Sequence, residues 1–219
     1  MNKTKAAIFD LDGTLIDSMW IWEKIDHDYL SSKGLAIPSN LKDEINHLSF
    51  NQTAHYFKNR FQLTESIEEI LKTWNDMAYN HYSNNISLKE GAKELLTYLK
   101  TNNIKIALAT SNSETLLTVA LKSTGIYEYF DVISTTNEVD KGKNFPDIYL
   151  LTANKLGVTP NNCVVFEDIL EAVKGAKLAN MKVCAVYDKY AEYQKEQLSL
   201  TADEYINNFK DINAIKKLL

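Results

Sequence analysis

Two acidic residues near the N-terminus have types and a spacing that could do chemistry. Asp10 and Asp12 follow the apolar run 6–9 and are separated by Leu11. Side chains on a strand point alternately to its two sides, so both carboxylates are expected on one side and Leu11 in the core. Carboxylates this close repel each other unless a cation or a shared proton relieves them. The pair therefore predicts a divalent metal site, with Gly13 allowing a sharp turn after it.

Two alternatives stay open for this acidic segment on the motif alone. A calcium-binding loop also begins Asp-x-Asp-Gly, but it follows a helix and needs a Glu at its twelfth position, where this chain has Ile21. Solvated acids at an ordinary strand end account for Asp10 and Asp12 equally well. The choice depends on residues farther along the chain.

Polar residues also end two later apolar runs. The run 104–109 is followed by Thr110, Ser111 and Asn112, and the run 163–166 by Glu167 and Asp168. Taken alone, the first set is better explained as the cap of the next helix, and the second set could also be a helix cap. The loop 141–147 carries Lys143, which alone would be an ordinary solvated lysine.

These groups together predict phosphoryl transfer. Ligands of an open parallel sheet bind beyond the carboxyl ends of its strands, so the groups are expected at one edge. A cation held by Asp10 and Asp168 would offset the charge of a phosphate group. The Thr110 hydroxyl, the Lys143 ammonium and backbone N–H groups at a helix start would hold its oxygens. One carboxylate is then left to attack phosphorus.

The elements that would position these residues alternate in type from residue 91 onward. Helical patterns at 91–100, 114–124, 146–156 and 171–179 alternate with strand-like runs at 104–110, 132–134, 163–166 and 183–186. This alternation predicts an α/β fold with helices covering a parallel sheet that includes the N-terminal run. Before it, helical patterns are expected at about 18–33, 39–48, 50–60 and 65–84. We therefore expect a core of residues 1–16 and 87–219 and an inserted helical domain of residues 17–86.

Composition narrows the class of partner. The 219 residues are 45% hydrophobic and 11% aromatic, with a formal net charge of −5, values that fit a folded chain and disfavour nucleic acid. No apolar run is long enough to span a membrane, so we expect a cytoplasmic protein without membrane contact. Cys163 and Cys184 lie in apolar runs and are expected as free thiols. The sequence does not decide the oligomeric state, and a monomer is compatible with it.

The motifs resemble those of the haloacid dehalogenase-like superfamily, in its phosphatase and β-phosphoglucomutase-like branch. In the family's order, the matching residues are Asp10-Leu11-Asp12-Gly13-Thr14, Thr110, Lys143 with Pro146-Asp147-Ile148-Tyr149, and Glu167-Asp168. The resemblance implies a Rossmann-like core with a helical cap inserted after the first motif. It also implies that the chain hydrolyses a small-molecule phosphate monoester and uses Mg²⁺.

The resemblance implies a role for each acidic residue. Asp10 would be the nucleophile that forms an aspartyl-phosphate, and Asp12 the general acid and base. Mg²⁺ would be bound by Asp10, the backbone carbonyl of Asp12 and Asp168, with Glu167 as an additional or water-mediated ligand. Ile169 stands where the family commonly has Ser, which removes a hydroxyl that could orient the metal ligands.

The remaining matched residues would hold the phosphoryl group. The resemblance gives this role to Thr110, to Lys143 and to the amide of Ser111. Lys141 is a competing candidate for the phosphate lysine, but the spacing to Pro146 favours Lys143.

Alternatives to a phosphatase remain. A sugar phosphomutase of the same branch carries a cap histidine shortly after the first motif, where this chain has Trp22; Trp20 and Trp22 follow that motif closely enough to overhang a site. A noncatalytic phospho-accepting or binding module, such as a signalling receiver domain, also gathers Asp, Thr and Lys at strand ends. Receiver domains are shorter and begin with adjacent acids. Asp12 argues against dehalogenases and phosphonate hydrolases. The sequence does not identify the substrate.

Overall fold

The computed structural model describes residues 4–45, 48 and 50–219. The chain divides into two compact units. One contains Met1–Asp17 and Ile86–Leu219, and the other contains Ser18–Asn85. The first unit therefore consists of two segments of the chain that are separated in sequence by the whole of the second.

The first unit contains a parallel sheet. Its strands lie in the order β5 (Val132–Thr135), β4 (Lys105–Thr110), β1 (Ala6–Phe9), β6 (Cys163–Glu167), β7 (Lys182–Val186) and β8 (Glu204–Ile206). Phe9 in the central strand is opposite Leu108 on one side and Phe166 on the other. The predicted α/β class is confirmed, and β8 is an edge strand that the sequence patterns did not indicate.

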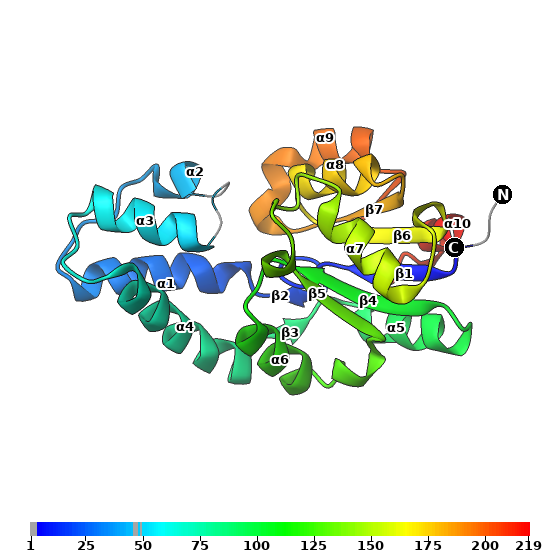
Figure 1. The fold of residues 1–219 in the computed structure, drawn as a ribbon, viewed down its shortest axis with the longest axis horizontal. Coiled ribbons are helices and arrows are strands. Elements are labelled where there is room, and N and C mark those ends of the chain that lie inside the picture. Colours follow the sequence, from blue (N-terminus) through cyan, green and yellow to red (C-terminus); the bar gives the residue numbers. More distant parts are fainter. Residues whose placement is uncertain (1–3, 46–47, 49) are drawn as a thin grey trace. The chain divides into compact units, whose positions relative to one another are not determined.

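Helices cover both faces of this sheet (Figure 1). The first unit contains α5 (Ala92–Thr101), α6 (Glu114–Ser123), α7 (Asp147–Leu156), α8 (Leu170–Leu178), α9 (Lys195–Thr201) and α10 (Ile212–Leu218). Short stretches of 3-10 helix lie at Tyr127–Tyr129, Thr136–Glu138, Pro160–Asn162 and Lys189–Gln194. Helix α7 packs on β1, β4 and β5, and α8 packs on β6 and β7. The strand order thus places α7 and α8 over the middle of the sheet.

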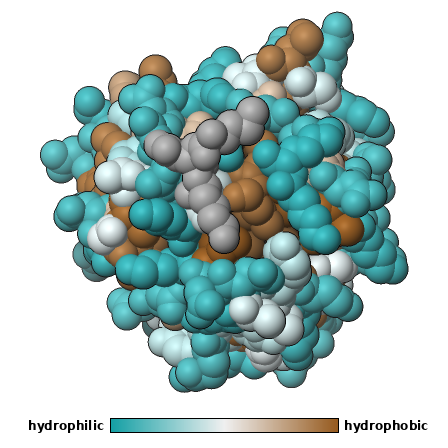
Figure 2. Space-filling view, turned by 90° about the vertical axis from the view of Figure 1, so that its right-hand side faces the viewer, coloured by the Kyte–Doolittle hydropathy of each residue, from teal (hydrophilic) through white to brown (hydrophobic). Residues whose placement is uncertain are grey.

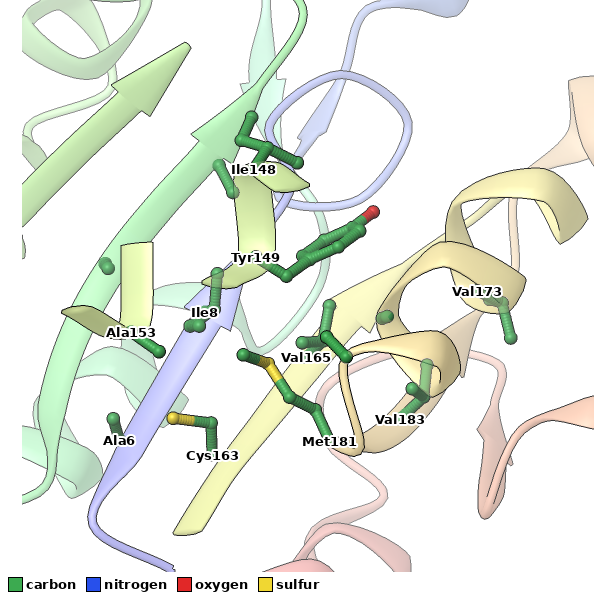
Figure 3. Packing of buried hydrophobic residues seen from close by; sticks show 14 of the residues in the cluster. Ala6, Ile8, Ile148, Tyr149, Ala153, Cys163, Val165, Val173, Met181 and Val183 are labelled. Atoms are coloured by element: carbon green, nitrogen blue, oxygen red, sulfur yellow. The ribbon is translucent and has the colours of Figure 1, made fainter. Parts of the chain in front are cut away.

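Alternation along the strands decides which face each side chain joins. Ala6 and Ile8 pack in a buried cluster with residues of α7 and α8, among them Tyr149 and Val173 (Figure 3). Phe9, which follows Ile8, turns to the opposite face, where its ring stacks on that of Phe166 with 4.5 Å between the ring centroids. The residue after the strand, Asp10, therefore continues on the side of α7 and α8.

A short antiparallel pair completes the first unit. It is formed by β2 (Ile16–Asp17) and β3 (Ser87–Leu88), which flank the second unit in sequence. Cys163 and Cys184 are buried free thiols, as predicted. Burial raises the pKa of both thiols, so they behave as small apolar residues of the core.

The second unit is helical in its described residues. It contains α1 (Met19–Ser32), α2 (Leu41–Ile45), α3 (Phe50–Arg60) and α4 (Ile67–Asn84). Residues 46 and 47 of the helix predicted at 39–48 lie outside the described residues. Tyr29, Phe57 and Trp74 form an aromatic cluster between α1, α3 and α4. Ser66 and Glu69 form a capping box that fixes the start of α4.

On the face shown in Figure 2, hydrophilic residues predominate and hydrophobic ones form small groups. This is the usual appearance of a surface in contact with water. Among the described residues, no helix combines the length and the apolar character needed to cross a membrane.

Candidate active site

Parallel strands bring Asp10 and Glu167 side by side. The backbone N–H of Asp10 donates to the carbonyl of Phe166 at 3.0 Å, which extends the β1–β6 ladder by one residue. Asp10 follows Ile8 by two residues, and Glu167 follows Val165 by two, so both carboxylates continue the face covered by α7 and α8. Both side chains are buried.

Three carboxylates converge at this point. Asp10, Glu167 and Asp168 are buried, and one carboxylate oxygen from each lies within 4.8 Å of the others. The Thr14 hydroxyl donates to Asp168 Oδ1 at 3.1 Å, so the turn after Asp10 also orients the third acid. An oxygen-rich group of this kind is the donor set that Mg²⁺ prefers.

Lys143 supplies the positive charge of the cluster. Its Nζ donates to Asp10 Oδ1 and also to Glu167 Oε1, the latter at 2.6 Å. A glycine on α8 makes this placement possible, because a Cβ at Gly175 would lie 1.9 Å from the carbonyl oxygen of Lys143. Lys141, the competing candidate, is exposed and lies over the Phe145 ring at 4.7 Å.

The pKa values of this cluster record an excess of negative charge. Burial raises the pKa of Glu167 to about 7, although the Lys143 ammonium acts in the opposite direction. Burial and the neighbouring Asp10 carboxylate raise the pKa of Asp168 well above its ordinary value. Burial alone would lower the pKa of Lys143, but the Asp10 and Glu167 carboxylates outweigh it and raise that pKa. A divalent cation would relieve this repulsion.

One buried oxygen supports the fit of a cation. Glu167 Oε2 is buried and has no hydrogen-bond partner among the described residues, whereas Glu167 Oε1 has two donors. An unpaired buried acceptor costs about 1–3 kcal/mol, and coordination to a metal removes that cost. The residues present therefore fit Mg²⁺.

Asp12 is joined to the residues that follow β4. The Asn112 amide donates to Asp12 Oδ2 at 2.8 Å, and the backbone N–H of Asn112 donates to the Thr110 hydroxyl oxygen at 3.1 Å. Ser111 follows Thr110 and is exposed. Because β4 is next to β1 in the sheet, Thr110 and Ser111 lie beside the end of β1. Within the described residues, their contacts do not join them to the carboxylate cluster.

A family model described as haloacid dehalogenase-like hydrolase matches residues 7–186, which include every residue of the cluster. The chain belongs to this family.

Two of the similar proteins are named as phosphatases. The hydrolase is 28% identical to a phosphorylated carbohydrates phosphatase from Thermotoga maritima, over 98% of this chain and 100% of the relative. It is 29% identical to a probable pseudouridine-5'-phosphatase from Drosophila melanogaster, over 89% of this chain and 87% of the relative. The predicted phosphatase class is thereby confirmed.

A solved structure supports the fold. The crystal structure of CbbY from Rhodobacter sphaeroides in complex with phosphate matches with a TM-score of 0.86 and 22% identity, over 98% of this chain and 99% of that chain. At this identity the likeness concerns the fold, which is the Rossmann-like α/β fold expected from the sequence.

Three polar contacts in this haloacid dehalogenase-like hydrolase were not predicted from the sequence. The Tyr149 hydroxyl donates to Glu167 at 2.9 Å, Thr14 donates to Asp168, and Asn112 donates to Asp12. A signal existed for Tyr149, because a tyrosine on the buried side of a helix needs a polar partner for its hydroxyl.

Ile169 follows Glu167 and Asp168 in the chain and bears on how these two acids are oriented. In place of the Ser common in the family, Ile169 supplies no hydroxyl to orient the metal ligands. Ile169 is exposed, and hydroxyls from Thr14 and Tyr149 contact the two neighbouring acids. Orientation of the acids is thus supplied by the turn that follows β1 and by α7.

Proposed function

We propose that this hydrolase is a Mg²⁺-dependent phosphatase that cleaves a small-molecule phosphate monoester through an aspartyl-phosphate on Asp10. The observation that carries the proposal is the convergence of Asp10, Glu167 and Asp168 around the Lys143 ammonium. The reaction needs a nucleophilic carboxylate and nearby positive charge that offsets the charge of the phosphate. The cluster supplies the carboxylate in Asp10 and positive charge in Lys143.

The reaction proceeds in two displacements. A carboxylate oxygen of Asp10 attacks phosphorus, the bond from phosphorus to the ester oxygen breaks, and the Asp12 carboxyl gives its proton to that oxygen. The Asp12 carboxylate then takes a proton from water as the water oxygen attacks phosphorus. The bond between phosphorus and Asp10 breaks, which releases inorganic phosphate and restores both aspartates.

Other residues hold the transferred group. Lys143 has three N–H donors, of which two contact Asp10 and Glu167, so one remains for a phosphoryl oxygen. The Thr110 hydroxyl and the Ser111 amide would bind further oxygens. Asp10, the backbone carbonyl of Asp12, Glu167 and Asp168 would hold Mg²⁺, which supplies charge stabilisation of the phosphoryl group.

Residues 17–86 are proposed as a helical cap domain, and residues 1–16 and 87–219 as the core into which it is inserted. The family's pattern and the compactness of Ser18–Asn85 support this division. A cap that closes during the first displacement would exclude water from Asp10.

The substrate class we favour is a phosphorylated carbohydrate. The full-length similarity to the Thermotoga maritima phosphatase supports it. The net charge of −5 favours a small-molecule partner over nucleic acid, and two buried free thiols are compatible with the cytoplasm. A sugar phosphomutase is not favoured, because the two relatives described above are named as phosphatases and Trp22 stands where the mutases have a histidine.

The test is phosphate release over a panel of sugar phosphates, nucleotides and an aryl phosphate, with and without Mg²⁺. We expect repeated turnover that needs Mg²⁺ and disappears in Asp10→Asn. A single phosphorylation without further release would indicate a phospho-accepting module instead. Isomerisation of glucose 1-phosphate faster than its hydrolysis would indicate a mutase.

A further inference from the structure

Tyr149 connects the apolar core to the candidate metal site. Its ring lies on α7 within the buried cluster, and Figure 3 shows its hydroxyl pointing away from Ala6 and Cys163, which lie at the starts of their strands. The side chain is fully buried. Its hydroxyl donates to Glu167 Oε1 at 2.9 Å, so the ring spans the distance from the sheet core to the acids.

The two oxygens of Glu167 have different surroundings. Oε1 accepts from both Tyr149 and Lys143, at 2.9 Å and 2.6 Å. Oε2 is buried without a partner among the described residues. Two donors on one oxygen restrict rotation of the carboxylate, so the direction in which Oε2 points is defined before any cation arrives.

We propose that Tyr149 is a positioning residue for the metal site. Its hydroxyl holds Glu167 so that Oε2 is presented to the divalent cation. This inference rests on the proposed function, because it assumes that Glu167 contributes to binding Mg²⁺.

The need for a second donor follows from the duties of Lys143. That ammonium is shared by Asp10 and Glu167 and would also bind the phosphoryl group. If binding a phosphoryl oxygen weakened the contact of Lys143 with Glu167, Tyr149 would remain as a donor to Glu167. Unlike Lys143, Tyr149 is anchored in the core, and within the described part of the chain its hydroxyl is not shared with a second acid.

A purely structural role makes a different prediction. If Glu167 merely satisfies a buried hydroxyl, Tyr149→Phe changes the stability of the protein and leaves metal affinity as it was. If Tyr149 orients Glu167, the same substitution weakens metal binding in the folded, substrate-free enzyme. Phe fills the same volume as Tyr without its hydroxyl, so the packing of α7 is retained.

The experiment measures Mn²⁺ binding to the substrate-free protein by electron paramagnetic resonance. We expect Tyr149→Phe to raise the Kd about 10-fold, the range found when a group that orients a metal ligand is removed. Tyr29→Phe is the matched control, since Tyr29 is also buried and its hydroxyl has no partner among the described residues. Its Kd should equal that of the wild type.

A double-mutant cycle with Glu167→Ala separates the possible causes. If Tyr149 acts through Glu167, adding Tyr149→Phe to Glu167→Ala leaves the Kd unchanged. A wild-type Kd in Tyr149→Phe, or fully additive effects in the cycle, would overturn the inference and leave the proposed function standing. Failure of the wild-type protein to bind Mn²⁺ would overturn the metal site of the proposed function itself.

Discussion

The Lys143 ammonium and the Glu167 carboxylate lie 2.6 Å apart, with 9% and 1% of their side chains exposed. Asp10 is a second partner of the same ammonium. Removing one partner from a buried ion pair leaves an uncompensated charge, which costs much more than loss of a surface pair. The cluster is a candidate catalytic centre, and the stability of the folded protein is also expected to depend on Lys143.

We expect Lys143→Met to lower the free energy of unfolding by about 3–5 kcal/mol in the absence of metal, because three buried carboxylates lose their cation. Urea unfolding measures this change, and added Mg²⁺ should restore part of it. The control is Lys174→Met, which removes an exposed pair with Glu171 on α8. If both substitutions changed the free energy of unfolding equally, the buried carboxylates would not depend on the charge of Lys143, and the prediction would be wrong.

Gly175 should control activity without touching substrate. A Cβ at this position would lie 1.9 Å from the Lys143 carbonyl oxygen, so Gly175→Ala must displace the loop that carries Lys143. We expect a loss of about 1–3 kcal/mol in stability and a fall in kcat of about 10- to 100-fold. Gly142→Ala is the control, because its Cβ would meet only the Asn144 side chain at 3.2 Å. Steady-state kinetics measures kcat of both variants. Equal kcat values for Gly175→Ala and Gly142→Ala would disprove this role of Gly175.

Asn112 should act on Asp12. Its amide donates to Asp12 Oδ2, and the Ser113 N–H fixes the amide by donating to Asn112 Oδ1 at 2.7 Å. Asn112→Ala removes a hydrogen bond to the proposed general acid and base, which should lower kcat about 10-fold and leave KM nearly unchanged. The exposed Asn161→Ala provides the comparison. A rise in KM at constant kcat would indicate instead that Asn112 binds substrate.

Asp26 in α1 gives the second unit a pH dependence. Burial, with a smaller contribution from Glu23, raises the pKa of Asp26 from 3.8 to about 7. A raised carboxyl pKa stabilises the folded state at low pH, and that stability is lost as pH rises through the folded pKa. In the wild type, this group should lower the free energy of unfolding by about 1.4 kcal/mol per pH unit between pH 4 and 7. We expect Asp26→Asn to remove that decline.

Chemical denaturation at several pH values measures that decline. Asp28→Asn is the control, because Asp28 is on the same helix, and its pKa is lowered by its hydrogen bond with Lys24. Parallel pH profiles for the wild type and Asp26→Asn would contradict the assignment.

The strand ends could be predicted because one periodicity governs both burial and direction. Two-residue spacing carries Ile8 to Asp10 and Val165 to Glu167, so apolar runs that end in acids already locate the site. The parallel sheet then brings the two ends together.

Contacts between helices and strands could not be predicted in the same way. Whether Tyr149 lies over Glu167 depends on where α7 crosses the sheet, and no local pattern encodes that crossing. The edge strand β8 is only Glu204–Ile206, too short for alternation to be visible. Gly175 gave no signal because its role comes from a loop that is distant in sequence.

The central claim is that Asp10 carries the phosphoryl group during turnover, and trapping that group tests it most directly. An aryl phosphate is suitable because its leaving group needs no proton, while Asp12→Ala is expected to slow hydrolysis of the intermediate. After acid quenching, peptide mass spectrometry should find one phosphoryl group on Asp10 in Asp12→Ala and none in Asp10→Asn/Asp12→Ala. Undiminished phosphate release by Asp10→Asn, or a phosphoryl group on another residue, would contradict the account.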